Sequence, residues 1–332
     1  MQYRRFGKTG WKISEIGFGC WGMGGNWGPR SDEKARAALR KALQLGVNFF
    51  DTAYVYGDGH SERILGEVLR AWFRDTPGRQ QAFYVATKVP AKTFEWPAHP
   101  KMRIADAFPV SWITRCAEVS LKRLGLEQID LLQLHVWTDA WVDTEEWRKA
   151  SEVLKSQGKI RAFGVSVNDH EPESVLKLVA TGQIDSVQVI YNIFDQSPEK
   201  ALFPLVQERD VAVIARVPLD EGSLTGSFTP ETRFPPGDWR SGYFKGERLA
   251  QACHRTEKLK AFLGSDASTL SSLALKFALH HSAASTVIPG MRTAEHVETN
   301  CAASDGKKLS PEVGQNLKTH AWPRNFYVGA WD

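Results

Sequence analysis

Four residues of reactive type lie at or just beyond the ends of three successive apolar runs of the sequence. Asp51 and Lys88 lie near the ends of the runs 47–53 and 82–89, His135 ends the run 128–135, and Tyr56 follows Asp51. A tyrosine hydroxyl titrates near 10, and a nearby ammonium favours its phenolate. Lys88 can therefore activate Tyr56, while Asp51 keeps Lys88 charged and in place. Tyr56 would then donate a proton to an oxygen that gains negative charge, and His135 would hydrogen-bond that oxygen or relay a proton.

This chemistry suits the reduction of a carbonyl group, in which hydride reaches carbon while oxygen takes a proton. The hydride must come from a cofactor, because no side chain supplies one. Taken singly, an aspartate at a strand end usually caps a turn, a lysine is usually solvated and a histidine is usually structural. Their convergence at adjacent strand ends favours the catalytic interpretation.

Such convergence requires neighbouring parallel strands. Eight short runs are β-branched or aromatic and almost wholly apolar, which is typical of strands buried on both faces. They cover residues 15–21, 47–53, 82–89, 128–135, 162–167, 185–192, 211–218 and 285–290. An open doubly wound sheet usually has about five or six strands, so eight βα units favour a closed (β/α)8 barrel, the TIM-barrel fold of the α/β class.

The stretches between these runs have helical periodicity. Ser31 is suited to cap a helix that ends near Gly46, similar patterns occupy residues 61–72 and 111–125, and further helices are expected to start at Pro172 and Pro198. Residues 3–14 predict an N-terminal β-hairpin that turns at 8–10 and closes the barrel floor. We expect a single domain over 1–332, with a long cofactor or lid loop at about 219–265 and a C-terminal tail at about 303–332.

Composition excludes several classes of protein. The 332 residues carry 42 basic and 38 acidic side chains, a net charge of +4 that argues against nucleic acid or an anionic membrane as partner. No run of about 18 apolar residues predicts a membrane span, and the N-terminus lacks the apolar core of a signal peptide. Four scattered cysteines predict neither a disulfide scaffold nor a metal site, and we expect a cytoplasmic protein.

Residues 17–22 match the pattern Gly-x-Gly-x-x-Gly of dinucleotide-binding folds. That motif requires its last glycine to open a helix whose N-terminus holds the pyrophosphate. Here a Gly- and Pro-containing stretch follows instead, and the next predicted helix waits until Ser31. We interpret residues 19–28 as a flexible loop at the mouth of the barrel.

Several longer motifs resemble the aldo-keto reductase superfamily. They are VNFFDTAYVYGDGHSERILGEVL at 47–69, YVATKV at 84–89, LKRLGLEQIDLLQLH at 121–135, GVSVN at 164–168, VIPG at 287–290 and AEHVETN at 294–300. The resemblance extends from about residue 3 to 302. It implies an NAD(P)H-dependent carbonyl reductase on a (β/α)8 barrel, with Asp51, Tyr56, Lys88 and His135 as catalytic tetrad and the tyrosine as general acid.

The resemblance also implies cofactor contacts. Ser166, Asn168 and Gln188 would hold the nicotinamide carboxamide, and Arg216 replaces an aromatic residue that often stacks on the nicotinamide. A cation at a helix N-terminus forms an anion site, here for the adenosine 2′-phosphate, so the resemblance implies NADPH rather than NADH. The remaining expected contacts are Trp21, Pro218, Leu219, Gly290, Arg292, Thr293, His296 and Asn300, together with the backbone groups of Gly222, Ser223, Leu224 and Thr225, whose segment would fold over the pyrophosphate.

Aromatic residues after strands 1, 2, 3 and 4 are expected to rim the substrate pocket, namely Trp21, Tyr54, Trp96 and Trp137, with Phe94 beside them. Such a rim predicts apolar or aromatic aldehydes and ketones as substrates. The aromatic C-terminal tail would either cap this pocket or form a subunit contact, so an oligomer stays open.

Two other functions remain compatible with the sequence. A cofactor-binding regulatory or redox-sensing subunit with slow turnover would keep the same barrel and tetrad. A Schiff-base aldolase would use Lys88 as nucleophile, although pairing with Asp51 would keep that lysine protonated.

Overall fold

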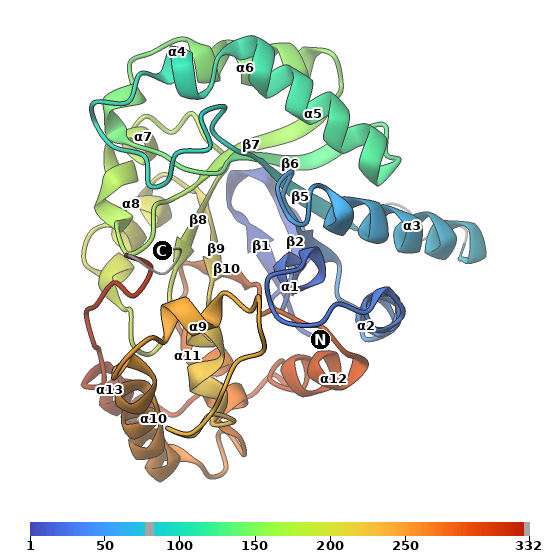
Figure 1. Cartoon of the computed structure of the whole chain (residues 1–332). Helices are drawn as coiled ribbons and strands as arrows, with labels where there is room; N and C mark the ends of the chain where they lie inside the picture. The colour runs from blue at the N-terminus through green and yellow to red at the C-terminus, as the bar shows by residue number, and fades with distance from the viewer. Residues whose placement is uncertain (77–82, 329–332) are drawn as a thin grey trace.

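Eight parallel strands form the centre of the computed structural model, which describes residues 1–76 and 83–328 (Figure 1). Each strand pairs with its neighbours in chain order, and parallel bridges Ile16–Val287 and Gly19–Gly290 join the first strand region to the last. The predicted (β/α)8 barrel is therefore confirmed. The strands are β3 Phe18–Gly19, β4 Phe49–Asp51, β5 Tyr84–Val89, β6 Ile129–Leu134, β7 Ile160–Ser166, β8 Ser186–Ile190, β9 Ala212–Arg216 and β10 Ala284–Val287.

A helix follows each strand and covers the outside of the barrel (Figure 1). The first of these helices, α2, shows why the sequence forms them. Ser31 caps it by accepting a hydrogen bond from the Lys34 amide, as predicted, and its apolar stripe, which includes Leu39, is buried. The covering helices are α2 Asp32–Gln44, α3 His60–Asp75, α5 Val110–Leu124, α6 Glu146–Ser156, α7 Leu176–Ala180, α8 Leu202–Glu208, α11 Leu270–His280 and α12 Ala294–Cys301. Additional helices are α1 Trp21–Gly24, α4 Ile104–Ala107, α9 Arg240–Tyr243, α10 Arg248–Leu259 and α13 Pro311–Lys318.

The predicted N-terminal hairpin is present and plugs the lower end of the barrel. Strands β1 Tyr3–Phe6 and β2 Trp11–Ser14 are joined by a 3-10 turn that ends at Gly10 with φ 71°. Phe6 stacks on Trp11 at 5.7 Å between ring centroids and lies 5.6 Å from Phe49 of β4. The hairpin thus shares an apolar cluster with the inner faces of the strands.

The inner face of the barrel changes from apolar to polar along each strand. Side chains two residues apart share a face of a strand. The apolar cluster at the floor of the barrel includes Phe49, Ala86, Leu131 and Ile214, so the residue two positions after each of them also points inward. Those positions are Asp51, Lys88, Gln133 and Arg216. A polar layer therefore stands at the carboxyl ends of the strands, where barrel enzymes carry their active sites.

The fold differs from the sequence expectation in its connections. The segment 219–265 contains α9 and the twelve-residue α10 rather than an unstructured loop. The N-cap position of α10 makes no side-chain hydrogen bond, so the start of this helix lacks a capping signal, although its buried residues Leu249, Ala252 and Leu259 recur at helical spacing.

Two shorter expectations are also corrected. The segment 19–28 holds the short helix α1 rather than only loop. Pro172 begins a 3-10 turn that precedes α7, and Pro198 is the second residue of the 3-10 turn Ser197–Glu199 that precedes α8. Residue 82 of the predicted strand 82–89 and residues 329–332 of the tail lie outside the described residues. None of the described helices combines the length and apolar character that a membrane crossing needs.

Candidate active site

A cavity of about 970 Å³ opens at the carboxyl ends of the strands. Its wall includes Asp51, Tyr56 and His135, which come from β4, the loop after it and the end of β6. The same wall continues along the ends of β7, β8 and β9 and over the segments that follow β9 and β10. The cavity therefore joins the predicted reactive residues to most of the predicted cofactor residues.

Lys88 lies at the centre of the reactive group. Its Nζ donates to Asp51 Oδ1 at 2.5 Å, to the Thr52 carbonyl at 2.8 Å and to the Tyr56 hydroxyl at 3.3 Å. The Lys88 side chain is wholly buried, so its charge acts on Tyr56 with little screening by water. His135 completes the group, with its ring 5.8 Å from the Tyr56 ring.

Burial and charge act in opposite directions on this group. Burial raises the pKa of Tyr56 more than the Lys88 cation lowers it, so the pKa is above its ordinary value. The expected lowering by Lys88 is present, but burial outweighs it, so the tyrosine is held as a proton donor. Burial lowers the pKa of Lys88, but Asp51 and Tyr56 outweigh it and raise the pKa overall. Burial and the neighbouring cations hold the pKa of His135 well below its usual range, so its imidazole is neutral.

The Tyr56 loop owes its position to glycines. Gly57 has φ 59°, and a Cβ added there would lie 2.0 Å from the Gly24 carbonyl oxygen. A Cβ on Gly24 would in turn lie 2.7 Å from the Tyr56 carbonyl carbon. The close approach of these two backbones sets α1 directly against the Tyr56 loop, which the dinucleotide-like glycine pattern at 17–22 did not predict.

Asp51 is held by partners beyond Lys88. Gln188 Nε2 donates to Asp51 Oδ2 at 2.8 Å, and Gln133 Nε2 lies 3.4 Å from the same oxygen. One end of the Gln188 amide is thus committed to the tetrad. The second N–H of Nε2 and the Oε1 oxygen can serve the cofactor contact expected for it.

The predicted cofactor residues divide into two groups. Those that line the cavity are Trp21, Ser166, Gln188, Arg216, Pro218, Leu219, Gly222, Thr225, Gly290, Arg292, His296 and Asn300.

Four predicted cofactor residues lie behind the wall. Asn168 exchanges hydrogen bonds with the Ala98 backbone, and Thr293 caps α12 by accepting from the His296 amide. The Ser223 hydroxyl donates to Asp220 at 2.5 Å, and Leu224 is buried in the core. Each of these side chains therefore has a structural role, and the backbone contacts expected of Ser223 and Leu224 stay predictions.

The segment after β9 is strained where it meets the cavity. Val217, Asp220 and Glu221 have φ values of 54°, 47° and 54°, which are unfavourable for side chains with a Cβ. A β-branched residue in this region is a marked outlier, and such strain persists only where the surroundings enforce it, as at ligand-binding sites. This segment is where the pyrophosphate contact was expected.

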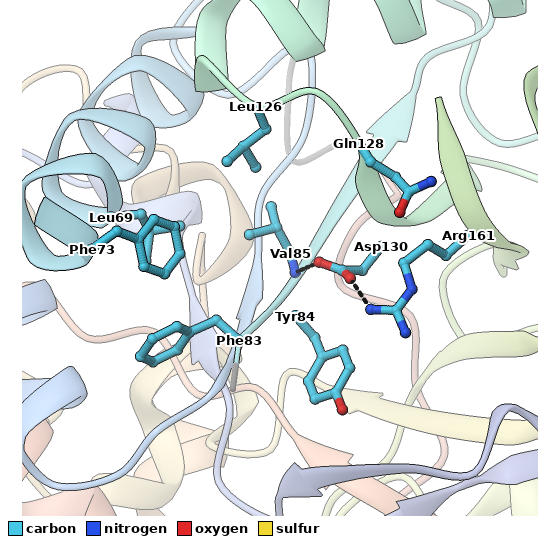
Figure 2. Close-up of a pocket in the computed structure, with 9 residues that line it drawn as sticks. All are labelled: Leu69, Phe73, Phe83, Tyr84, Val85, Leu126, Gln128, Asp130 and Arg161. Atoms are coloured by element: carbon cyan, nitrogen blue, oxygen red, sulfur yellow. Dashed lines mark hydrogen bonds and ion pairs between the residues drawn. The ribbon is translucent and has the colours of Figure 1, made fainter. Parts of the chain in front are cut away.

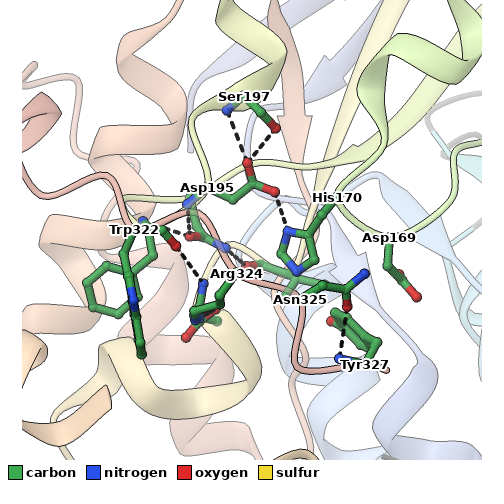
Figure 3. A network of polar contacts seen from close by, with 12 residues as sticks. Asp169, His170, Asp195, Ser197, Trp322, Arg324, Asn325 and Tyr327 are labelled. Atoms are coloured by element: carbon green, nitrogen blue, oxygen red, sulfur yellow. Dashed lines mark hydrogen bonds and ion pairs between the residues drawn. The ribbon is translucent and has the colours of Figure 1, made fainter. Parts of the chain in front are cut away.

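The C-terminal tail forms part of the cavity wall. Tyr327 lines the cavity and its hydroxyl donates to Glu221, while Arg324 pairs with Asp220 at 2.5 Å. Figure 3 shows Arg324 and Tyr327 on the tail, with Asn325 between them. Of the two roles considered for this tail, capping the pocket matches the described structure. Glu221 and Tyr327 carried no motif and were missed by the sequence analysis.

The aromatic rim is narrower than predicted. Trp21, Phe94 and Trp96 line the cavity, and the Trp96 ring stands perpendicular to the His135 ring at 5.3 Å. Trp137 is fully buried and packs 5.7 Å from Trp141, so it belongs to the core.

Tyr54 is the second aromatic residue outside the rim. Its ring lies 6.2 Å from Trp112 and beneath the Arg123 guanidinium at 4.3 Å, away from the cavity wall. The expected pocket roles of Trp137 and Tyr54 are therefore wrong in this structure. A strand-end position alone did not reveal which way either ring turns.

Asp169 is a further residue that the sequence analysis missed. Its Oδ1 accepts from Arg216 Nη2 at 2.8 Å and its Oδ2 accepts from Trp96 Nε1 at 2.9 Å. One carboxylate thus fixes both the rim tryptophan and the cation at the end of β9. Its position directly after Asn168 was the only available signal.

A second cavity, of about 510 Å³, lies at the opposite end of the strands (Figure 2). Its wall includes Tyr84 and Asp130 near the starts of β5 and β6, and Asp130 pairs with Arg161 at 2.7 Å. The amino ends of barrel strands generally serve stability rather than chemistry. We therefore assign the reactive site to the larger cavity.

Comparison with known proteins agrees with this geometry. The profile of the aldo/keto reductase family matches residues 15–321. The chain belongs to that family. It is accordingly an NAD(P)H-dependent oxidoreductase, and the resemblance noted in the sequence is confirmed.

Individual relatives cover almost the whole chain. An aldo-keto reductase yakc [NADP(+)] of Schizosaccharomyces pombe is 28% identical over 88% of this chain and 84% of its own length. An NADH-specific methylglyoxal reductase of Escherichia coli (strain K12) is 28% identical over 90% and 91%. The solved structure of aldo-keto reductase AKR11C1 from Bacillus halodurans, holo form, superposes with a TM-score of 0.73 at 29% identity, covering 97% of this chain and 96% of that one.

Proposed function

We propose that this aldo/keto reductase is an NADPH-dependent reductase of apolar or aromatic aldehydes and ketones. The observation that carries the proposal is the buried chain Asp51–Lys88–Tyr56, with contacts of 2.5 Å and 3.3 Å, at the wall of a large cavity. This arrangement holds a protonated phenol where it can meet a carbonyl oxygen. The bound nicotinamide cofactor would supply hydride to the carbonyl carbon.

Tyr56 acts as the general acid. Its raised pKa keeps the hydroxyl protonated before reaction. As the carbonyl oxygen gains charge and takes the proton, the phenolate left on Tyr56 is stabilised by Lys88, whose own charge Asp51 maintains. The same pairing opposes the aldolase alternative, because a Schiff base requires an unprotonated lysine.

His135 orients the substrate as a neutral donor. Its depressed pKa excludes an imidazolium near neutral pH, so the ring can hydrogen-bond the carbonyl oxygen without competing as an acid. Trp96 stands against one edge of His135, and Trp21 lies 6.3 Å from Tyr56 on another side. These apolar surfaces favour uncharged, flat substrates.

The cavity wall fits a nicotinamide dinucleotide. Its volume of about 970 Å³ is at the upper end of ligand sites, and it continues from the reactive residues to the start of α12. Ser166, Gln188 and Arg216, on strands β7, β8 and β9, line the part of the cavity at the strand ends, where the reactive residues also lie. Arg292 and His296, at the other end of the wall, would supply donors for a phosphate and favour NADPH, although two Arg292 nitrogens also donate to the Trp27 and Pro29 carbonyls.

The test is oxidation of NADPH, followed by absorbance, with an activated aromatic aldehyde such as 4-nitrobenzaldehyde. Wild type and Tyr56→Phe are compared side by side, with cofactor binding measured by quenching of tryptophan fluorescence. Loss of the general acid should lower kcat by roughly 10²–10⁴-fold while the dissociation constant of NADPH stays within about twofold. A wild type that binds cofactor but reduces no carbonyl, or a variant with undiminished kcat, contradicts the proposal.

A further inference from the structure

Arg216 places a fixed cation in the polar layer beside the tetrad. Its Nη2 donates to Asp169 Oδ1 at 2.8 Å and to the Val167 carbonyl at 3.0 Å, so the guanidinium is held on one edge. Its Nε is buried and has no hydrogen-bond partner among the described residues. The side chain nevertheless lines the cavity, so this cation faces whatever occupies the site.

The charge of Arg216 reaches the reacting groups. Burial has the largest effect on the pKa values of both Tyr56 and His135, but the Arg216 charge contributes to lowering each of them. The guanidinium and the reacting groups therefore share one weakly screened chamber. Asp169, which also accepts from Trp96 at 2.9 Å, pairs with Arg216 and offsets part of its positive charge.

The two redox forms of a nicotinamide ring differ in charge. The oxidised ring is a pyridinium with one positive charge, and the reduced dihydronicotinamide is neutral. A hydride donor must approach within about 3–3.5 Å of the carbonyl carbon whose oxygen meets the Tyr56 hydroxyl. The ring that changes charge must therefore lie at the end of the cavity that Arg216 shares with Tyr56 and His135.

We propose that Arg216 makes this site select the reduced over the oxidised cofactor, and that Asp169 sets the strength of the selection. The inference rests on the proposed function, because it requires a nicotinamide cofactor in this cavity. A cation beside the ring repels the pyridinium and leaves the neutral ring unaffected. The oxidised cofactor is consequently a weak competitor of the reduced one, which suits an enzyme that works in the direction of reduction.

A different role for Arg216 gives a different pattern. If its guanidinium held the diphosphate, its removal would weaken both redox forms equally, because both carry the same diphosphate. If it served only the fold, its removal would lower stability without changing the preference between the two forms. The ratio of two dissociation constants therefore separates charge selection from both alternatives.

The experiment measures the dissociation constants of NADPH and NADP⁺ by quenching of tryptophan fluorescence, at one pH and one ionic strength. NADH and NAD⁺ are titrated in parallel, and the pair that binds more tightly is used. The main variant combines Arg216→Gln with Asp169→Asn, which removes both charges and leaves no lone buried carboxylate. Arg216→Lys keeps the cation, and Asp169→Asn alone removes only the anion.

The neutral double variant should lower the ratio of the oxidised to the reduced dissociation constant by about tenfold. Arg216→Lys should retain most of the wild-type ratio, and Asp169→Asn should raise it several-fold, because the cation then acts without its counter-ion. A purely structural effect would not lower the ratio in the double variant and raise it in Asp169→Asn. An unchanged ratio in the double variant, while the wild type binds cofactor and reduces aldehyde, overturns this inference alone; failure of the wild type to bind either cofactor pair overturns the proposed function.

Discussion

Replacing Glu221 by glutamine tests whether the carboxyl that joins the segment after β9 to the C-terminal tail is protonated in the folded protein. Glu221 is 5% exposed, and burial raises the pKa of its carboxyl to about 8 despite the hydrogen bond from Tyr327. Nearby charges divide in sign: Asp220 and Asp169 raise this pKa, and Arg216 lowers it. The carboxyl is therefore mostly protonated in the folded protein at neutral pH.

The sign of the effect on stability follows from linkage. A group whose pKa is raised by folding contributes stability that is complete below its unfolded pKa and is lost as pH rises towards its folded pKa. For Glu221 that window runs from about 4.5 to about 8. Each pKa unit is about 1.4 kcal/mol, so the wild type loses about 3 kcal/mol relative to Glu221→Gln between pH 5.5 and 8.5.

The assay is thermal unfolding without cofactor at a series of pH values. Unfolding entropy of about 2.1 cal/mol/K per residue converts 3 kcal/mol into about 4 °C for a chain of 332 residues. The melting temperature of Glu221→Gln should therefore rise above that of the wild type by about 4 °C more at pH 8.5 than at pH 5.5. Glu231→Gln, on the exposed part of the same segment, controls for the loss of one negative charge. A difference between Glu221→Gln and wild type that stays constant over this range would refute the reasoning.

Three other outcomes are expected. Arg292→Met should raise the dissociation constant of NADPH at least about tenfold and leave that of NADH nearly unchanged, because only NADPH carries the 2′-phosphate; equal weakening of both would contradict the assignment. Lys88→Met should lower kcat about 10²–10³-fold and destabilise the chain, and adding Asp51→Asn should restore the melting temperature without restoring kcat. Arg324→Leu leaves Asp220 buried and unpaired, at a cost of about 3–5 kcal/mol that Asp220→Asn should largely recover in thermal unfolding.

The strand ends were predictable because two local rules agree there. Strands buried on both faces have apolar sequences, and side chains two residues apart share a face. Asp51 and Lys88 therefore follow inward-facing Phe49 and Ala86 as a matter of register. The barrel, its floor and the convergence of the tetrad all follow from such short-range regularities.

The loops were less predictable because side-chain direction there depends on distant partners. Trp96 and Trp137 occupy equivalent-looking positions after neighbouring strands, yet one meets Asp169 at the cavity and the other packs against Trp141 in the core. No periodicity distinguishes the two tryptophans. Trp96 is held by a residue 73 positions away, a contact that leaves no local signal in the sequence.

The same reasoning explains why the wall opposite the tetrad escaped prediction. Glu221 and Tyr327 are 106 residues apart, and each lies in a segment without helical or strand periodicity. A buried carboxyl at positive φ is unfavourable by itself, so it persists because the tail supplies a hydroxyl donor and because Arg324 neutralises the adjacent Asp220. The reactive residues at the barrel ends are positioned by local register, whereas the wall at Glu221, where we propose that the cofactor binds, depends on contacts with the tail. Changes in the tail should therefore alter cofactor affinity before they alter the chemical step.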